Sequence, residues 1–230
     1  MAKIEAKKRR IGPLDCMEVL GDPKAPTIVL FHGYGADMND LVSLAGAIQA
    51  PKNSNWYFPN GHLSVPLGGH SEGRAWFPIP LAELQAGTNL DLSERIPPGM
   101  KKSRENARAF VEKLGISPSR LVLGGFSQGA MLATDLMLHM SEPPAGLALL
   151  SGTLVNKTEW EELAKAHSGF QFFQAHGVRD QILSFEAAQK LEQLFKRSGW
   201  LGTLQRFEGG HEIPSEVLIQ LGSYLRKVLP

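Results

Sequence analysis

The stretch LVLGGFSQG, residues 121–129, joins an apolar run to the beginning of a helical pattern. The run Leu121–Phe126 predicts a buried strand, and the residues from Ser127 to about Met140 predict a helix. The motif is G-x-S-x-G, with Gly125 and Gly129 beside the serine, where a tight strand-to-helix turn requires small neighbours. A serine on such a turn lies at a helix N-terminus, which favours developing negative charge. The stretch therefore predicts a nucleophilic serine, and the alternative is an inert serine in a glycine-rich turn.

Other apolar runs of strand length recur along the chain and alternate with helical patterns. The predicted strands are Thr27–Phe31, Leu147–Leu150, Phe170–Gln174 and Thr203–Phe207, and the predicted helices cover Phe185 to Phe195 and Val217 to Val228. Continuous apolar strands separated by helices indicate a mostly parallel central sheet with helices on both faces. We therefore predict an α/β fold in which residues 1–230 form a single domain. Residues 59–98, rich in proline, are predicted to be an irregular loop region near the active site.

A serine nucleophile needs a base, and the base needs an acid that orients it. In open parallel sheets, reactive groups lie on loops beyond the carboxyl ends of the strands. Asp180 and His211 each follow a predicted strand, and the chain order Ser127, Asp180, His211 is the expected one. The alternatives are a turn-forming or helix-capping role for Asp180 and a surface position for His211.

The first core strand ends in His32-Gly33-Tyr34-Gly35. Glycines there allow backbone N–H groups to turn toward the serine. We predict that the backbone N–H groups of Tyr34 and Gln128 form an oxyanion hole. His32 is interpreted as a structural histidine and not as a second catalytic one.

The aromatic pair Trp76 and Phe77 is interpreted as an apolar wall for the acyl chain of a substrate, with ordinary loop packing as the alternative. His176, Asp180 and His211 form a metal set as an alternative to the catalytic one. However, the sequence contains no zinc-binding spacing, and we expect no metal. It also lacks phosphate-binding loop motifs, so it gives no support to nucleotide chemistry.

The composition of the 230 residues, 43% hydrophobic and 20% charged, is typical of a globular protein. Its 24 Lys and Arg against 23 Asp and Glu give no field that favours nucleic acid. No apolar run reaches about 18 residues, so we expect no integral membrane association. The single cysteine, Cys16, cannot form an internal disulfide, which predicts a cytoplasmic location. The basic segment from Lys3 to Arg10 is interpreted as solvated and not as a secretion signal.

Seven segments in order resemble the phospholipase/carboxylesterase family of α/β-hydrolases, which includes bacterial carboxylesterases and acyl-protein thioesterases. They are FHGYGAD (31–37), FPN (58–60), RAWF (74–77), GGFSQGAM (124–131), LALLSG (147–152), AHGVRD (175–180) and EGGHEIP (208–214). The resemblance runs from about Thr27 to the C-terminus. It implies the α/β-hydrolase fold and a Ser–His–Asp mechanism that needs no cofactor. It places Ser127, His211 and Asp180 at the triad positions and Tyr34 and Gln128 at the oxyanion donors. Such relatives are often dimers, so a homodimer is one possible assembly.

The sequence departs from the family pattern at two places. Pro78-Ile79-Pro80 follows the RAWF segment, where relatives often have an aspartate, and Tyr34 stands where leucine is common. Because the oxyanion donor is a backbone group, Tyr34 leaves the chemistry intact, while the altered loop leaves the substrate preference open.

We therefore expect a serine hydrolase that cleaves small-molecule carboxylic esters through an acyl-enzyme, with acyl thioesters and lysophospholipids as further candidate substrates. One alternative is a non-catalytic binding protein on the same fold, although such proteins usually lose a triad residue. The other alternative is a serine peptidase or amidase, which ranks lower because the sequence carries no gating domain.

Overall fold

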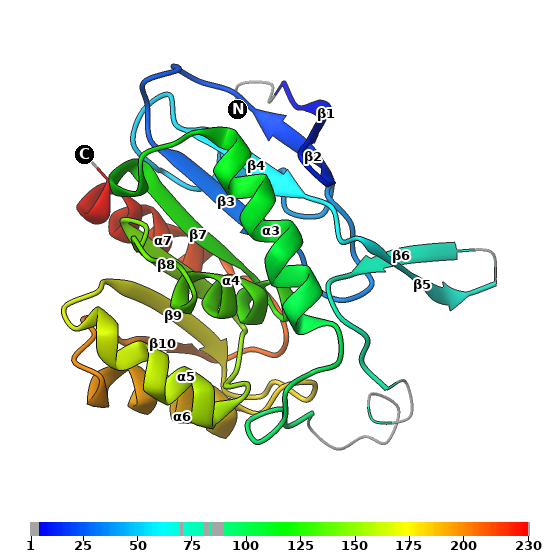
Figure 1. Cartoon of the computed structure of the whole chain (residues 1–230), viewed down its shortest axis with the longest axis vertical. Coiled ribbons are helices and arrows are strands. Elements are labelled where there is room, and N and C mark those ends of the chain that lie inside the picture. Colours follow the sequence, from blue (N-terminus) through cyan, green and yellow to red (C-terminus); the bar gives the residue numbers. More distant parts are fainter. Residues whose placement is uncertain (1–4, 70, 81–82, 84–89, 230) are drawn as a thin grey trace.

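An eight-stranded sheet forms the centre of the computed structural model, which describes residues 5–69, 71–80, 83 and 90–229 (Figure 1). The strands lie in the order β1-β2-β4-β3-β7-β8-β9-β10. Their bounds are β1 Lys7–Ile11, β2 Leu14–Val19, β3 Thr27–Phe31, β4 Asn55–Pro59, β7 Leu121–Phe126, β8 Gly146–Leu150, β9 Phe172–Gly177 and β10 Leu204–Phe207. From β4 to β10 every neighbouring pair is parallel, whereas β1 pairs with β2, and β2 with β4, in the antiparallel sense. The predicted α/β fold with a mostly parallel sheet is confirmed.

Helices cover both faces of this sheet. They are α1 Leu44–Ala47, α3 Met100–Leu114, α4 Gln128–Leu138, α5 Lys157–Ala164, α6 Phe185–Arg197 and α7 Ser215–Val228. In β3, Val29 and Phe31 pack on the side of α3, α4, α5 and α6, whereas Ile28 and Leu30 pack on the side of α1 and α7. Figure 1 shows α3 and α4 in front of the central strands and α7 behind them. The apolar strands are thus buried on both sides, as continuous apolar runs require.

Several predicted boundaries differ from the observed ones by one to three residues, and those of α4 and β9 lie near the candidate site. Helix α4 begins at Gln128, one residue after the serine, and ends at Leu138. Strand β9 extends to Gly177, so that His176 lies inside the strand and not after it. The reason is that β10 continues the hydrogen-bonded ladder, because Arg206 pairs with His176 and Phe207 with Gly177.

The basic N-terminal segment forms a strand. Lys7–Ile11 is the edge strand β1, and its four basic residues are exposed. Arg9 and Arg10 contact the carboxylates of Glu18 and Asp15 on β2 at 3.4 and 3.1 Å. The described part of the segment is exposed as predicted, but the pairing with β2 gives it a regular structure that its composition does not indicate.

Part of the region 59–98 is regular, which corrects the prediction of an irregular loop. Strands β5 (Leu63–Gly68) and β6 (Ser71–Ala75) form an antiparallel hairpin that projects from the main body (Figure 1). The pairing register shifts between Pro66 and Gly68, so the strand tolerates its proline at an irregularity. Residues 70, 81–82 and 84–89 of this region lie outside the described residues. Among the helices that are described, none has both the length and the apolar character needed to cross a bilayer.

Candidate active site

Ser127 lies on a strained turn between β7 and α4. Its φ and ψ are 55° and −119°, a conformation that costs a non-glycine residue about 1–3 kcal/mol. The turn brings α4 against the end of β3. A Cβ atom at Gly125 would lie 2.6 Å from the carbonyl oxygen of Phe31, and one at Gly129 would overlap the same oxygen. The two glycines of the motif are therefore required by the close approach of backbone to backbone.

His211 and Asp180 lie in contact, as the sequence predicts for a base and its acid. The Nδ1 atom of His211 is 2.6 Å from the Oδ2 atom of Asp180. The Oδ1 atom of Asp180 accepts hydrogen bonds from the N–H groups of Ile182 and Leu183, each at 2.9 Å. Burial acts to raise the pKa of Asp180, but the hydrogen bonds from His176, His211 and Leu183 bring it well below its usual range. Asp180 is therefore an ionised acceptor, and the proton of the His211 ring lies on Nδ1.

His176 is a second imidazole on the same carboxylate. Its Nε2 atom is 3.2 Å from Oδ2 of Asp180 and 2.9 Å from the carbonyl oxygen of Leu183. Both neighbours are acceptors, so Nε2 carries the proton and donates to both. The three residues considered above as an alternative metal set thus lie together, and the short distances between them are hydrogen bonds to Asp180. This role of His176 was not predicted from the sequence, where its place four residues before Asp180 was the available signal.

The loops that carry the acid and the base are tied to each other. The backbone N–H of Arg179 donates to the carbonyl oxygen of Gly209 at 3.0 Å, and the Arg179 guanidinium donates to that of Glu208 at 2.8 Å. Because β9 and β10 are adjacent and parallel, both loops leave the same edge of the sheet. This arrangement fixes the position of His211 relative to Asp180.

A cavity of about 420 Å³ opens beside Ser127 and His211. Tyr34 and Gln128, the residues of the predicted oxyanion donors, also line it. Within the described part of the chain, neither of these two backbone N–H groups has an acceptor. The four residues that the sequence predicts as nucleophile, base and oxyanion donors therefore meet around one space.

The apolar wall of this cavity consists of side chains that the sequence analysis did not single out. They are Ile79, Leu90, Phe126, Met131, Ile182 and Leu183. The ring of Phe126 lies 4.8 Å from that of His211. The spacing along the chain was the available signal, because Met131 is one helical turn beyond Ser127 and Ile182 is two residues beyond Asp180.

The prediction that Trp76 and Phe77 form the acyl wall needs correction. Both side chains are fully buried in the core on the α3–α6 side of the sheet. Neither is among the described residues that line the cavity. The backbone N–H of Trp76 donates to Oε1 of Gln128 at 2.8 Å, and the Nε2 of Gln128 donates to the carbonyl oxygen of Phe77 at 2.7 Å. The pair is held behind the Ser127 turn because its backbone is bound to the Gln128 side chain.

His32 is buried with both ring nitrogens in hydrogen bonds, in agreement with its structural interpretation. Its Nδ1 is 2.7 Å from the carbonyl oxygen of Gly33, and its Nε2 accepts from the N–H of Gly61 at 2.9 Å. Nδ1 is thus the protonated nitrogen. Burial lowers the pKa of His32 to about 4, so the ring is neutral near pH 7.

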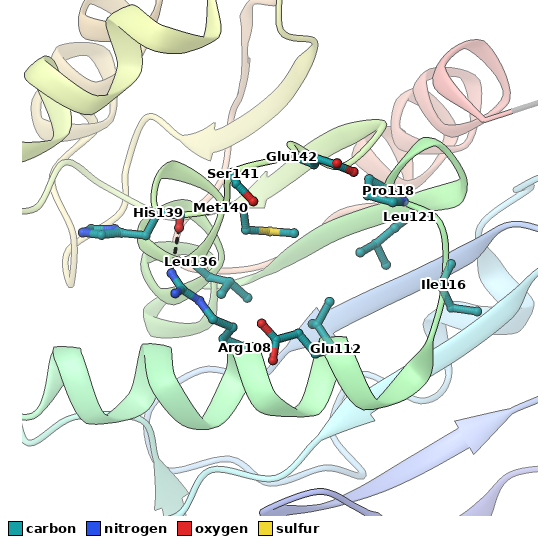
Figure 2. A pocket seen from close by; sticks show the side chains of 11 residues that line it. Arg108, Glu112, Ile116, Pro118, Leu121, Leu136, His139, Met140, Ser141 and Glu142 are labelled. Atoms are coloured by element: carbon teal, nitrogen blue, oxygen red, sulfur yellow. Dashed lines mark hydrogen bonds between the residues drawn. The ribbon is translucent and has the colours of Figure 1, made fainter.

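A second cavity, of about 340 Å³, lies between α3 and the end of α4 (Figure 2). It adjoins Leu121, at the start of β7, and is thus remote from Ser127, which follows the end of that strand. Figure 2 shows the Arg108 guanidinium directed at the backbone carbonyl of His139, to which it donates at 2.7 Å.

Asp135, His139 and Glu159 bring their ligand-type atoms close together near this second cavity. The two carboxylate oxygens of Asp135 already accept hydrogen bonds. Arg104 donates to Oδ2 at 2.9 Å, and the indole N–H of Trp160 donates to Oδ1 at 3.0 Å. A metal ion would have to displace a guanidinium, so the donor set does not fit one.

Comparisons with known proteins show which family this chain resembles. The family model described as Phospholipase/Carboxylesterase matches residues 16–229. A probable carboxylesterase SOBER1-like of Arabidopsis thaliana is 27% identical over 215 residues, which cover 90% of this chain and 80% of that protein. Acyl-protein thioesterase 1 of Candida albicans is 25% identical over 228 residues, which cover 91% and 94%.

Solved structures extend the comparison to the fold. The crystal structure of esterase PE8 superposes with a TM-score of 0.74 at 25% identity, covering 95% of this chain and 99% of that one. A carboxylesterase from Mesorhizobium loti gives 0.72 at 18% identity, covering 96% and 98%. With a family model that spans nearly the whole sequence, this chain belongs to the phospholipase/carboxylesterase family.

Proposed function

We propose that the protein is a serine hydrolase that cleaves carboxylic esters through an acyl-enzyme. The observation that carries the proposal is the 2.6 Å contact between His211 and Asp180, made beside a strained serine that opens onto the same cavity as His211. An ionised acid, a base in a fixed tautomer and a serine that borders the cavity are the three parts that serine acyl transfer needs.

In the acylation half, the Oγ of Ser127 attacks the carbonyl carbon of the ester, and its proton passes to Nε2 of His211. The carbonyl oxygen becomes an oxyanion that accepts hydrogen bonds from the N–H groups of Tyr34 and Gln128. The bond to the leaving alkoxide then breaks, and the His211 imidazolium protonates the alkoxide. The products of this half are an alcohol and the acyl ester of Ser127.

In the deacylation half, water attacks the acyl-enzyme, and His211 accepts a proton from that water. The second oxyanion occupies the same site as the first. When it collapses, Ser127 leaves and recovers its proton from His211, and the carboxylic acid is released. Asp180 remains ionised throughout, because its hydrogen bonds hold its pKa far below the working pH.

The cavity wall supports an acyl group as the part of the substrate that the protein holds. Ile79, Met131 and Ile182 offer apolar surface next to the serine, and a methylene removed from water there contributes up to about 0.8 kcal/mol. Aryl esters, acyl thioesters and lysophospholipids all present such a chain. Rates with aryl esters of graded length, one acyl thioester and one lysophospholipid identify the preferred acyl donor.

The decisive test is the Ser127→Ala variant. We expect kcat to fall by several orders of magnitude with little change in the melting temperature. The matched control is Ser151→Ala, because Ser151 is also a buried serine with positive φ just past a neighbouring strand. This control retains most of the activity, and an organophosphonate labels Ser127 but not Ser151.

Other results favour the other functions. Wild-type protein that binds esters without turnover, and that no phosphonate labels, is a binding protein. Faster cleavage of amides than of matched esters indicates a peptidase or amidase. We also propose a cytoplasmic location, which suits a chain whose single cysteine, Cys16, is buried.

A further inference from the structure

We infer that Trp76 is a positioning residue that sets the separation of the two oxyanion donors, acting through the Gln128 side chain on one side and the His32 carbonyl on the other. The inference rests on the proposed function, because it assigns a role in the site that would hold the oxyanion. It replaces the expected contact between Trp76 and the acyl chain with a different task.

Trp76 is bound to both of the segments that supply the donors. Its backbone N–H donates to Oε1 of Gln128 at 2.8 Å, and its indole N–H donates to the carbonyl oxygen of His32 at 2.9 Å. Gln128 supplies one proposed donor, and His32 stands two residues before Tyr34, which supplies the other. A single side chain with its own backbone therefore spans the two halves of the oxyanion hole.

The Gln128 side chain makes this attachment rigid. Its amide accepts from Trp76 and donates to the carbonyl oxygen of Phe77 at 2.7 Å, so it pairs with the backbone as a neighbouring strand would. The side chain is 1% exposed, and an unpaired amide would be costly at that depth. The residue that presents one proposed donor is thus fixed at its side chain as well as in α4.

The Tyr34 segment is held on both sides of the proposed donor. Before it, the His32 carbonyl accepts from the Trp76 indole. After it, the N–H of Gly35 donates to the carbonyl oxygen of Arg74, and the N–H of Arg74 donates to that of Ala36, each at 2.8 Å. The strand that ends just before Trp76 therefore orders the loop on which the Tyr34 N–H lies.

Trp76 itself has little freedom to move. Its ring packs edge-on against Phe31 with the centroids 5.2 Å apart, its side chain has no exposed surface, and its carbonyl oxygen accepts from the hydroxyl of Ser103. Oxyanion donors act at about 2.7–3.1 Å from the developing charge. A small shift of either segment therefore weakens the hydrogen bonds to the transition state more than those to the bound substrate. Loss of one donor in such a site costs about 10²–10³ in kcat, and a displaced donor is expected to cost less.

The test is Trp76→Phe, which removes the indole N–H and keeps an aromatic ring. We expect kcat to fall about 10-fold per active site counted by phosphonate titration, with KM changed less than about twofold. The affinity for a boronic acid, which forms a tetrahedral adduct with the serine, falls by the same factor as kcat/KM.

The matched control is Trp200→Phe. Trp200 is also buried, and its indole N–H also donates to a backbone carbonyl oxygen, that of Ala164, at 3.0 Å. Both variants lose the same kind of bond and are expected to lose thermal stability. Only the Trp76 variant is expected to lose kcat per titrated site.

Gln128→Met is the second variant, because it keeps the backbone N–H and removes the pairing with Trp76 and Phe77. It is expected to reproduce the loss of kcat, and the double variant is expected to lose less than the product of the two single losses. The inference is overturned if Trp76→Phe and Gln128→Met both keep the wild-type kcat per titrated site. It is also overturned if Trp200→Phe loses as much kcat per titrated site as Trp76→Phe. Neither result affects the proposed function, which is tested separately by Ser127→Ala.

Discussion

The Nε2 atom of His176 lies 3.2 Å from Oδ2 of Asp180, the same oxygen that the Nδ1 of His211 contacts at 2.6 Å. The two imidazoles therefore share one carboxylate oxygen, and His176 is fully buried. A donor at this place fixes the carboxylate in the plane that His211 needs and withdraws part of its charge.

His176→Phe removes that donor and keeps a ring of similar size. We expect kcat/KM to fall about 10-fold, which is ~1.4 kcal/mol of transition-state stabilisation. The pH of half-maximal kcat/KM is expected to move upward, because Asp180 then attracts the imidazolium form of His211 more strongly.

His176→Gln, which restores an N–H donor, is the control for this prediction. It is expected to recover part of both changes. If His176→Phe lowers only the melting temperature, with an unchanged pH profile, His176 has a packing role alone.

Asp180→Asn is expected to lower kcat by up to about 10⁴ with the fold preserved, because His211 then loses the acceptor that fixes its tautomer. In the wild type, kcat/KM rises with pH through one ionisation, since only neutral imidazole accepts the serine proton. A steady-state pH profile of both proteins checks this. Activity that a chelator abolishes and zinc restores would contradict the mechanism.

Asp180 also affects acid stability. Its pKa is lowered in the folded state, so its contribution is complete above the unfolded value of about 3.9 and is lost as pH falls below that value toward the folded one. Urea unfolding between pH 5 and pH 2 is therefore expected to show a steeper loss of stability in the wild type than in Asp180→Asn. If the free energy of unfolding falls in parallel with pH in both proteins, Asp180 gains no proton affinity on unfolding.

His32 affects the stability of the fold at a higher pH than Asp180 does. Its pKa falls from 6.5 in the unfolded chain to about 4 in the folded one, so the unfolded chain binds the proton first. Stability is then lost as pH falls from about 6.5 to 4, by up to about 3 kcal/mol. We expect His32→Gln to be less stable at pH 7 but to lose less stability over this window. Denaturant unfolding at closely spaced pH values measures the slope, and equal slopes would contradict the buried neutral ring.

Met131 offers the sharpest test of the cavity wall. Met131→Ala is expected to flatten the dependence of kcat/KM on acyl chain length, because the shortened side chain removes apolar surface beside the serine. The matched control is Met137→Ala. Met137 is on the same helix and equally buried, but it is not among the described residues that line the cavity. Both variants are expected to lose about 2–5 kcal/mol of the free energy of unfolding. Measuring kcat/KM with acetate, butyrate and octanoate esters separates the two variants. If kcat/KM depends on chain length with the same slope in both, Met131 does not contact the acyl chain.

The parts of the fold that follow from local pattern were predicted from the sequence. The run Leu121–Phe126 and the helix after it are contiguous, and their apolar spacing alone indicates them. Strand β1, with exposed Lys7 to Arg10, has no such pattern, because its only regular feature is the pairing with β2. An edge strand with polar side chains has no local signal to be found.

The candidate site divides in the same way. Ser127, Asp180 and His211 could be predicted as candidates because each follows a strand of its own. The role of Trp76 was missed because its partners Gln128 and His32 are 52 and 44 residues away along the chain. Aromatic residues in a proline-rich loop suggest ligand contact, and only the tertiary packing shows that this one is buried behind the turn.

The sheet order has a consequence for how the chain folds. Strand β3 pairs with β7, although residues 32–120 separate them, whereas β7, β8, β9 and β10 are neighbours in both sequence and space. Closing the longer loop costs more chain entropy, and pairing between distant strands is slow. The β7–β10 half, with Ser127, Asp180 and His211, is then expected to form before β3 docks and brings the Tyr34 segment into place. A refolding chain would bury Trp160 and Trp200 early and regain turnover only in a later kinetic phase.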